Sequence, residues 1–558
     1  MKKQHLIIRI LNFLFKGGLV IFELFIGVIL VLITLIIIVS KISPPDVESI
    51  DIGERIKVAD NHYIIGDNWL KKNEFGVWEM YIEGAPYERG LIYGKLAKEL
   101  VQKQETIFVK QIDNLVPSQT WQQFLRLMIG FFNKDLPDFI AIENQQEIYG
   151  ISQSFSDEYN YIASKYDRIL NYHAAHDIGH ALNDYSMVGC TSFAIKDDKT
   201  IDSSLIVGRN FDFFVGDDFA EEKLVLFIKP DKGHAFASYS WAGFTGVVSG
   251  LNTEGLSVTI NASKSDLPTG AKTPISLLAR EILQYASTID EAIAIAKTRE
   301  TFVSETIMVS SRKDRKAALI EKSPTKMGVY YTETNTLICS NHYQSEAFIN
   351  DPINITNIEE SDSKYRYNRV QSLLNEQRQL DIYSAAAILR NQHGENGDTL
   401  GMGNPRAINQ LIVHHSVVIQ PEELKFYITT RDFQLGAFKG YDLSKVFVKK
   451  DASSVLSIAP DPFLYSRDYK LFKQYKTVKN KISSFLNFNT PLSLSEAEVQ
   501  AFINSNRELY ITYEMLGRYF LKKKDQASAK NYFELALTKK VASPAIEKEF
   551  EELIKECN

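Results

Sequence analysis

Hydrophobic residues follow one another almost without interruption near the N-terminus. The run extends from Leu19 to Val39, and Glu23 is its only charged residue. A helix of about 20 residues spans the ~30 Å hydrocarbon core of a membrane. A cleaved signal peptide would have a shorter apolar region that ends at a small-residue site, which this run lacks. The pattern therefore predicts an uncleaved membrane anchor over residues 17–40.

The charges around this run predict its orientation. Four basic residues precede it: Lys2, Lys3, Arg9 and Lys16. Only Lys41 follows it closely. Basic residues stay on the cytoplasmic side, so we expect a single-pass membrane protein with a cytoplasmic N-terminus. The first unit would be residues 1–45, and the remainder of the chain would be extracytoplasmic (periplasmic or extracellular).

A helical pattern follows in residues 46–189. Apolar residues recur at helical spacing at Leu91, Tyr93, Leu96 and Leu100, and long charged residues occupy the other positions. This period of three to four residues is typical of amphipathic helices. We expect an N-terminal helical leader here.

From Val188 onward, short alternating runs bounded by polar turns indicate β-strands. Three helices interrupt the strands: Ile275–Lys297, Ser363–Gln377 and Ile382–Gln392. Groups of strands mixed with helices, without βαβ alternation, indicate a layered α+β domain over residues 190–450.

The C-terminal part differs again. Residues 451–495 are expected to form a linker, and residues 496–558 a helical hairpin. Six residues occupy the offsets of one tetratricopeptide (TPR) repeat: Leu516, Gly517, Phe520, Ala529, Phe533 and Ala536. A single repeat cannot bury its own apolar face, so it packs on the body, on another helix or on a partner protein.

Composition narrows the possible functions. The 558 residues are 45% hydrophobic and 24% charged, with 63 Lys+Arg against 69 Asp+Glu. These are globular proportions, which exclude a disordered or low-complexity chain. No basic excess is present, so nucleic acid is not expected as a partner. The three cysteines, Cys190, Cys339 and Cys557, are too few for a disulfide framework.

Cys190 stands in the most distinctive chemical context. Gly189 precedes it, and the predicted hairpin that it opens ends in Gly-Arg209-Asn-Phe-Asp212. A neighbouring arginine lowers the pKa of a thiol, and the thiolate is the nucleophile. The alternative is a small buried hydrophobic residue, which is the usual role of an isolated cysteine.

Several motifs in order resemble one family. They are Gly-Cys190-Thr-Ser, Gly-Arg209-Asn-Phe-Asp-Phe and matching segments at residues 83–90, 250–262, 340–343, 363–369 and 415–421. Together they resemble the N-terminal-nucleophile (Ntn) hydrolases, in the group of acyl-coenzyme A:6-aminopenicillanic acid acyltransferase. Choloylglycine hydrolase and acid ceramidase are more distant relatives of that group. The resemblance covers roughly residues 75–435 and implies a four-layer αββα sandwich.

The resemblance also implies a mechanism and a set of site residues. The chain would cut itself between Gly189 and Cys190, whose thiol and new α-amine would serve as nucleophile and base. The implied catalytic residues are Cys190, Arg209, Asp212, Asn261, Asn341 and Arg366. Arg209 would orient the thiol, Asp212 would hold the ammonium, and Asn341 with the Asn261 backbone would bind the oxyanion. Arg366 would position Asn341, with Arg369 as its competitor.

The expected activity is hydrolysis or transfer of the acyl group of a small N-acyl amide through a Cys190 thioester, with no cofactor. Two alternatives remain open. His173, His176 and His180 have a spacing that could ligate zinc, with Asp177 as an oxygen ligand. The chain could also be a catalytically inactive, membrane-tethered interaction protein that binds a partner through the TPR-like tail.

Overall fold

The computed structural model describes residues 23–116, 118–182, 189–213, 216–266, 270–452 and 454–557. Residues 23–39 form a helix. Across the described ranges, no helix has both the length and the apolarity that a membrane crossing requires. Residues 17–22 of the predicted anchor lie outside the described residues. For the described remainder, this finding contradicts the predicted membrane anchor and the predicted single-pass, extracytoplasmic location.

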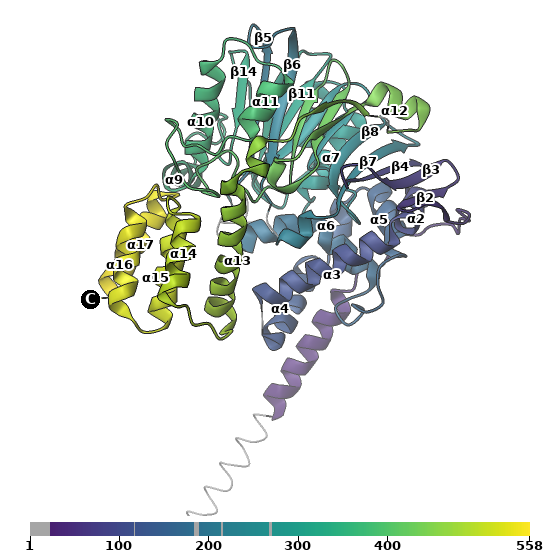
Figure 1. Cartoon of the computed structure of the whole chain (residues 1–558). Coiled ribbons are helices and arrows are strands. Elements are labelled where there is room, and N and C mark those ends of the chain that lie inside the picture. The colour runs from purple at the N-terminus through teal and green to yellow at the C-terminus, as the bar shows by residue number, and fades with distance from the viewer. Residues whose placement is uncertain are drawn as a thin grey trace, which may run out of the picture.

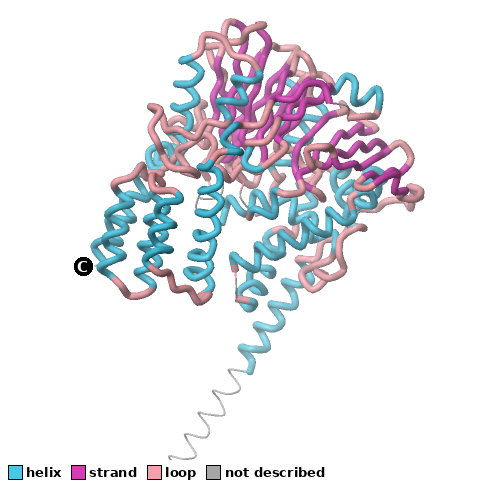
Figure 2. The backbone as a smooth tube through the Cα atoms, viewed as in Figure 1, coloured by secondary structure: helices cyan, strands magenta, loops and turns pink. Residues whose placement is uncertain are grey.

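Two β-sheets form the centre of the molecule (Figures 1 and 2). Within the described residues, the larger sheet has eleven strands in the order β1 (Ile56–Ala59), β2 (His62–Ile65), β3 (Asn68–Lys72), β4 (Trp78–Gly84), β7 (Lys223–Pro230), β8 (Phe236–Trp241), β9 (Ser249–Asn252), β10 (Leu256–Ala262), β11 (Glu305–Ser311), β12 (Lys316–Lys322) and β13 (Met327–Tyr330). The described part of the smaller sheet has seven, in the order β14 (Thr336–Cys339), β5 (Thr191–Asp197), β6 (Ser203–Phe211), β15 (His415–Gln420), β16 (Lys425–Thr429), β17 (Phe438–Asp442) and β18 (Ser454–Ile458).

The alternation of side chains along each strand explains how the sheets are layered. In β5, Ala194 belongs to the apolar core between the two sheets. Its neighbours Phe193 and Ile195 lie in a second core, beneath the helices α10 (Ser363–Glu376) and α11 (Ile382–Leu389). Successive strand residues point to opposite faces, so one strand serves both cores.

Helices also cover the outer face of the larger sheet. The apolar cluster on that face contains residues of β4, β7 and β10 and of the helices α2 (Pro86–Leu96), α5 (Ile142–Ser152), α6 (Lys165–Leu182) and α7 (Ile275–Tyr285). The layers are therefore helix, sheet, sheet and helix. The αββα sandwich expected from the resemblance is present; the membrane helix expected before it is not found among the described residues.

The segment 46–189 is more than a helical leader. Its strands β1–β4 extend the larger sheet, and β4 pairs in parallel with β7. Its described helices are α2, α3 (Lys98–Leu115), α4 (Gln119–Phe132), α5 and α6. At the crossing of α2 and α5, a Cβ atom on Gly90 would lie 2.1 Å from the Glu147 carbonyl oxygen. Only glycine allows this approach, so Gly90 lets α2 pack closely against α5 within this segment.

The helix predicted over Ile275–Lys297 is two helices, α7 and α8 (Ile289–Lys297). Thr288 caps the second helix, with its side chain and that of Glu291 forming a capping box. A capping box satisfies backbone N–H groups at a helix start, so it favours a new helix at this point.

The C-terminal region is helical and packs on the body. The expected linker contains β18 and the long helix α13 (Arg467–Phe488), followed by α14 (Glu496–Ser505), α15 (Tyr510–Lys522), α16 (Gln526–Leu537) and α17 (Pro544–Glu556). A Cβ atom on Gly517 would lie 2.7 Å from the Phe533 ring, so the small residue sets the closeness of α15 and α16. Asn404 Nδ2 donates to the Lys540 carbonyl oxygen at 2.8 Å, which ties the tail to the sandwich.

Candidate active site

The β5–β6 hairpin brings a thiol and a guanidinium together. Cys190 immediately precedes β5, and Ser192 pairs with Arg209 across the hairpin. Arg209 Nη2 lies 3.7 Å from Cys190 Sγ, and both residues are buried. Arg209 Nη1 donates to Ser249 Oγ at 2.9 Å. These contacts hold the guanidinium beside the thiol.

The buried surroundings of Cys190 disfavour the thiolate form of its side chain. Burial raises its pKa to about 11, although the charge of Arg209 and a backbone hydrogen bond from Asp212 act in the opposite direction. A charged thiolate is costly in a desolvated site. Burial therefore favours the protonated form of this thiol.

Asp212 is a buried carboxyl group next to the Gly189–Cys190 bond. The Gly189 N–H donates to the Asp212 backbone oxygen at 3.2 Å. Burial raises the pKa of the Asp212 carboxyl well above its usual range. Its Oδ1 atom has no hydrogen-bond partner among the described residues. A buried acceptor without a partner is costly, so this atom is suited to receive a new donor.

Asn341 is fixed from several sides. Arg366 Nη2 donates to its side-chain oxygen, and its Nδ2 donates to the Ala262 carbonyl oxygen at 2.9 Å. Arg369 Nε lies 3.2 Å from Asn391 Oδ1 instead. Of the two competing arginines, Arg366 is the one that contacts Asn341.

Asn261 lies in β10 on the larger sheet. Its side-chain oxygen accepts from Ser192 Oγ at 2.7 Å, and its Nδ2 donates to the Cys339 carbonyl oxygen at 3.3 Å. These bonds link the two sheets next to Cys190. The structure thus gathers the six predicted residues around the start of β5. Asn261 is followed in β10 by Ala262, whose carbonyl oxygen accepts the hydrogen bond from Asn341.

Among the predicted zinc ligands, the structure describes only the side chain of His173, and that side chain has other partners. Both ring nitrogens of His173 are engaged: Nδ1 lies 2.8 Å from the Ile169 carbonyl oxygen, and Nε2 accepts from the Thr245 N–H at 3.0 Å. The ring stacks on Phe244. The side chains of His176, Asp177 and His180 lie outside what the structure describes. In the described residues, no group of three or more His, Cys, Asp or Glu is placed to hold a metal ion.

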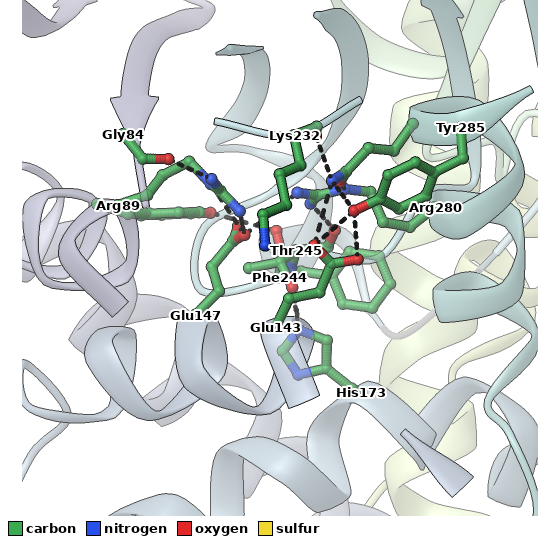
Figure 3. A network of polar contacts seen from close by, with 12 residues as sticks. Gly84, Arg89, Glu143, Glu147, His173, Lys232, Phe244, Thr245, Arg280 and Tyr285 are labelled. Carbon is green, nitrogen blue, oxygen red and sulfur yellow. Dashed lines mark hydrogen bonds and ion pairs between the residues drawn. The ribbon is translucent and has the colours of Figure 1, made fainter. Parts of the chain in front are cut away.

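A buried polar network connects the two sides of the predicted cut (Figure 3). Arg89 Nε donates to Glu147 Oε2 at 3.0 Å, and Arg280 Nη2 donates to the same oxygen at 3.2 Å. Although burial raises the pKa of Glu147, the two guanidinium groups outweigh it and lower that pKa. Arg89 and Glu147 precede Gly189 in the chain, whereas Arg280 follows it. The network therefore joins the two segments that cleavage would produce.

Two further groups at the site were not predicted from the sequence. Gln410 Nε2 donates to the Gly189 carbonyl oxygen at 3.1 Å. His415 Nε2 lies 3.0 Å from Ser249 Oγ, which in turn contacts Arg209. Gln410 follows no motif, and the fold brings it to Gly189 from a loop far along the chain.

Comparison with known protein families gives one match. Residues 199–429 match the family model described as acyl-coenzyme A:6-aminopenicillanic acid acyl-transferase. The match begins after Cys190 and includes the other five predicted residues, Arg209, Asp212, Asn261, Asn341 and Arg366. The chain is thus related to the Ntn amide hydrolases and acyltransferases, which confirms the resemblance seen in its motifs.

Individual proteins match at low sequence identity. An uncharacterized protein of Archaeoglobus fulgidus is 27% identical over 281 residues, which cover 46% of this chain and 45% of that protein, under half its length. Among solved structures, a Caenorhabditis elegans ortholog of N-acylethanolamine-hydrolyzing acid amidase is 18% identical, with a TM-score of 0.31 over 42% of this chain and 93% of that one. A conjugated bile acid hydrolase from Clostridium perfringens is 14% identical, with a TM-score of 0.30 over 46% and 93%.

Proposed function

We propose that this protein is an autoprocessing cysteine amidohydrolase or acyltransferase that acts on small N-acyl amides through a Cys190 thioester. The observation that carries the proposal is the position of Arg209 Nη2, which lies 3.7 Å from Cys190 Sγ. Cys190 is the residue that follows the proposed cleavage site. A cation beside a cysteine favours the thiolate that attacks a carbonyl carbon.

Self-cleavage would come first. The Cys190 thiol attacks the Gly189 carbonyl carbon, the C–N bond to Cys190 breaks, and the thiol proton passes to the released nitrogen. Water then hydrolyses the thioester and regenerates the thiol. Cys190 becomes the first residue of a new chain, with a free α-amine whose ordinary pKa of about 7.7–8.0 suits a general base near neutral pH.

The surroundings of Asp212 support this step. Its Oδ1 atom has no hydrogen-bond partner among the described residues before cleavage. The new ammonium group of Cys190 would supply both a donor and a positive charge to that buried carboxyl group. Ionisation of Asp212 would then be favoured, because an adjacent opposite charge stabilises the charged form.

Turnover would use the same residue twice. The Cys190 α-amine takes the thiol proton, the thiolate attacks the substrate amide, and the acyl group forms a thioester as the amine departs. Water or an amine then accepts the acyl group. Asn341 and the Asn261 backbone N–H would stabilise the oxyanion, with Arg366 positioning Asn341.

A fluorogenic N-acyl aminocoumarin series of increasing acyl length tests this proposal. Hydroxylamine in the assay traps the acyl group as a hydroxamate, which reports transfer. The matched control is Cys339→Ala, because Cys339 is also a buried cysteine in this sheet. We expect Cys339→Ala to retain hydrolysis and Cys190→Ala to lose it. Undiminished hydrolysis by Cys190→Ala would overturn the proposal.

A further inference from the structure

Gln410 contacts the one carbonyl group that self-cleavage must attack. Its Nε2 atom lies 3.1 Å from the Gly189 carbonyl oxygen and 3.4 Å from Asp212 Oδ2. The residue is buried, with 4% of its surface exposed. A buried amide on a carbonyl oxygen polarises that carbonyl and excludes water from it.

The backbone around Gln410 is well fixed. The Leu411 N–H donates to Asn409 Oδ1 at 2.9 Å, and the Asn409 N–H donates to the Asn391 carbonyl oxygen at 2.8 Å. Leu411 is fully buried in the core of the C-terminal helices. The backbone that carries the Gln410 side chain is therefore fixed on both sides of this residue.

Gly189 is adapted to this contact. A Cβ atom on Gly189 would lie 2.3 Å from Gln410 Nε2, so a larger residue here would displace the Gln410 amide. The glycine before Cys190 thus permits the amide to approach the bond that would be cut.

We propose that Gln410 is the oxyanion donor of the self-cleavage step, distinct from the donors that serve the substrate amide. This inference rests on the proposed function above. As Cys190 Sγ bonds to the Gly189 carbonyl carbon, the carbonyl oxygen becomes an alkoxide, and Gln410 Nε2 donates to it. When the alkoxide collapses, the C–N bond breaks, and the Cys190 nitrogen leaves with the thiol proton.

Asn341 is not placed for this role in the uncleaved chain. Its Nδ2 atom donates to the Ala262 carbonyl oxygen at 2.9 Å. The two amides therefore address two different carbonyl groups, and processing can be impaired without loss of the substrate oxyanion donors.

The test measures how fast newly synthesised chain is cut. The protein is made in a cell-free reaction, and the intact and cleaved chains are followed by denaturing electrophoresis and intact mass. The variants are Gln410→Met and Gln410→Glu. The matched control is Gln434→Met, because Gln434 is also buried and its Nε2 donates to the Leu389 carbonyl oxygen at 2.8 Å.

We expect Gln410→Met to be cut at least ~100-fold more slowly, as when one oxyanion donor is removed, and Gln434→Met at the wild-type rate. Gln410→Glu should be slow at neutral pH and faster as the pH falls, because a protonated carboxyl group can donate. Wild-type rates in Gln410→Met would overturn the inference. If Gln410→Met does not fold, a Gln410→Glu rate that is independent of pH overturns it. An uncut wild-type chain would instead overturn the proposed function, and this role with it.

Discussion

The Arg89–Glu147–Arg280 cluster gives the most exact prediction about stability. Replacing Glu147 by glutamine keeps the shape of the side chain and removes its charge. Arg89 and Arg280 would then face each other, buried, without the carboxylate that both now contact. Removing one partner of a buried ion pair costs about 3–5 kcal/mol, because the remaining charge stays desolvated.

A matched change on the surface separates this effect from a general loss of charge. Arg55 and Glu99 form an ion pair at 2.7 Å, in which the Glu99 side chain is 66% exposed. Exposed pairs contribute about 0–1 kcal/mol. Glu99→Gln should therefore change the free energy of unfolding by no more than about 1 kcal/mol.

Urea unfolding of the purified chain, followed by tryptophan fluorescence, measures both variants against the wild type. We expect Glu147→Gln to lower the free energy of unfolding several times more than Glu99→Gln. If Glu147→Gln costs no more than Glu99→Gln, the carboxylate does not compensate the buried arginines, and the reasoning is refuted.

Three further results are expected. Burial lowers the pKa of His173 to about 4. As the pH falls, this histidine is therefore protonated in the unfolded chain before it is protonated in the folded chain, which favours unfolding. The free energy of unfolding measured in urea should fall by about 3 kcal/mol between pH 6.5 and 4, and this decrease should be smaller in His173→Gln. Gly517→Ala places a methyl group against Phe533 and should destabilise the tail by about 1–3 kcal/mol, seen as a lower thermal midpoint; an unchanged midpoint would contradict the tight α15–α16 contact. Arg209→Met removes the cation beside Cys190 and should reduce amide hydrolysis about 100-fold, with wild-type rates counting against its role.

Local pattern was sufficient for much of the sandwich. In β5, apolar residues occupy both faces. The polar turn after β5 leads into β6, and the two strands pair as predicted, with Ser192 opposite Arg209. The hairpin therefore brought Arg209 and Asp212 to Cys190 as expected. The motif around Ser363 also placed Arg366 near Asn341, and the fold then selected Arg366 over Arg369.

Local pattern was insufficient where the structure depends on distant partners. All four residues of β1 are exposed, so this short strand has no buried face that marks it in the sequence. Glu147 and Arg280 are far apart in sequence, as are Gly189 and Gln410, and no spacing connects them. The apolar run before Lys41 has the composition of a membrane helix, but no helix among the described residues is both long and apolar enough to cross a membrane.

The central claim is that the chain cuts itself before Cys190 and that the new N-terminal cysteine performs the chemistry. N-terminal sequencing of the purified wild-type protein, after separation on a denaturing gel, tests it most directly. We expect a fragment that begins Cys-Thr-Ser-Phe, and a Cys190→Ala chain that stays intact. An intact wild-type chain that still hydrolyses N-acyl amides would contradict it.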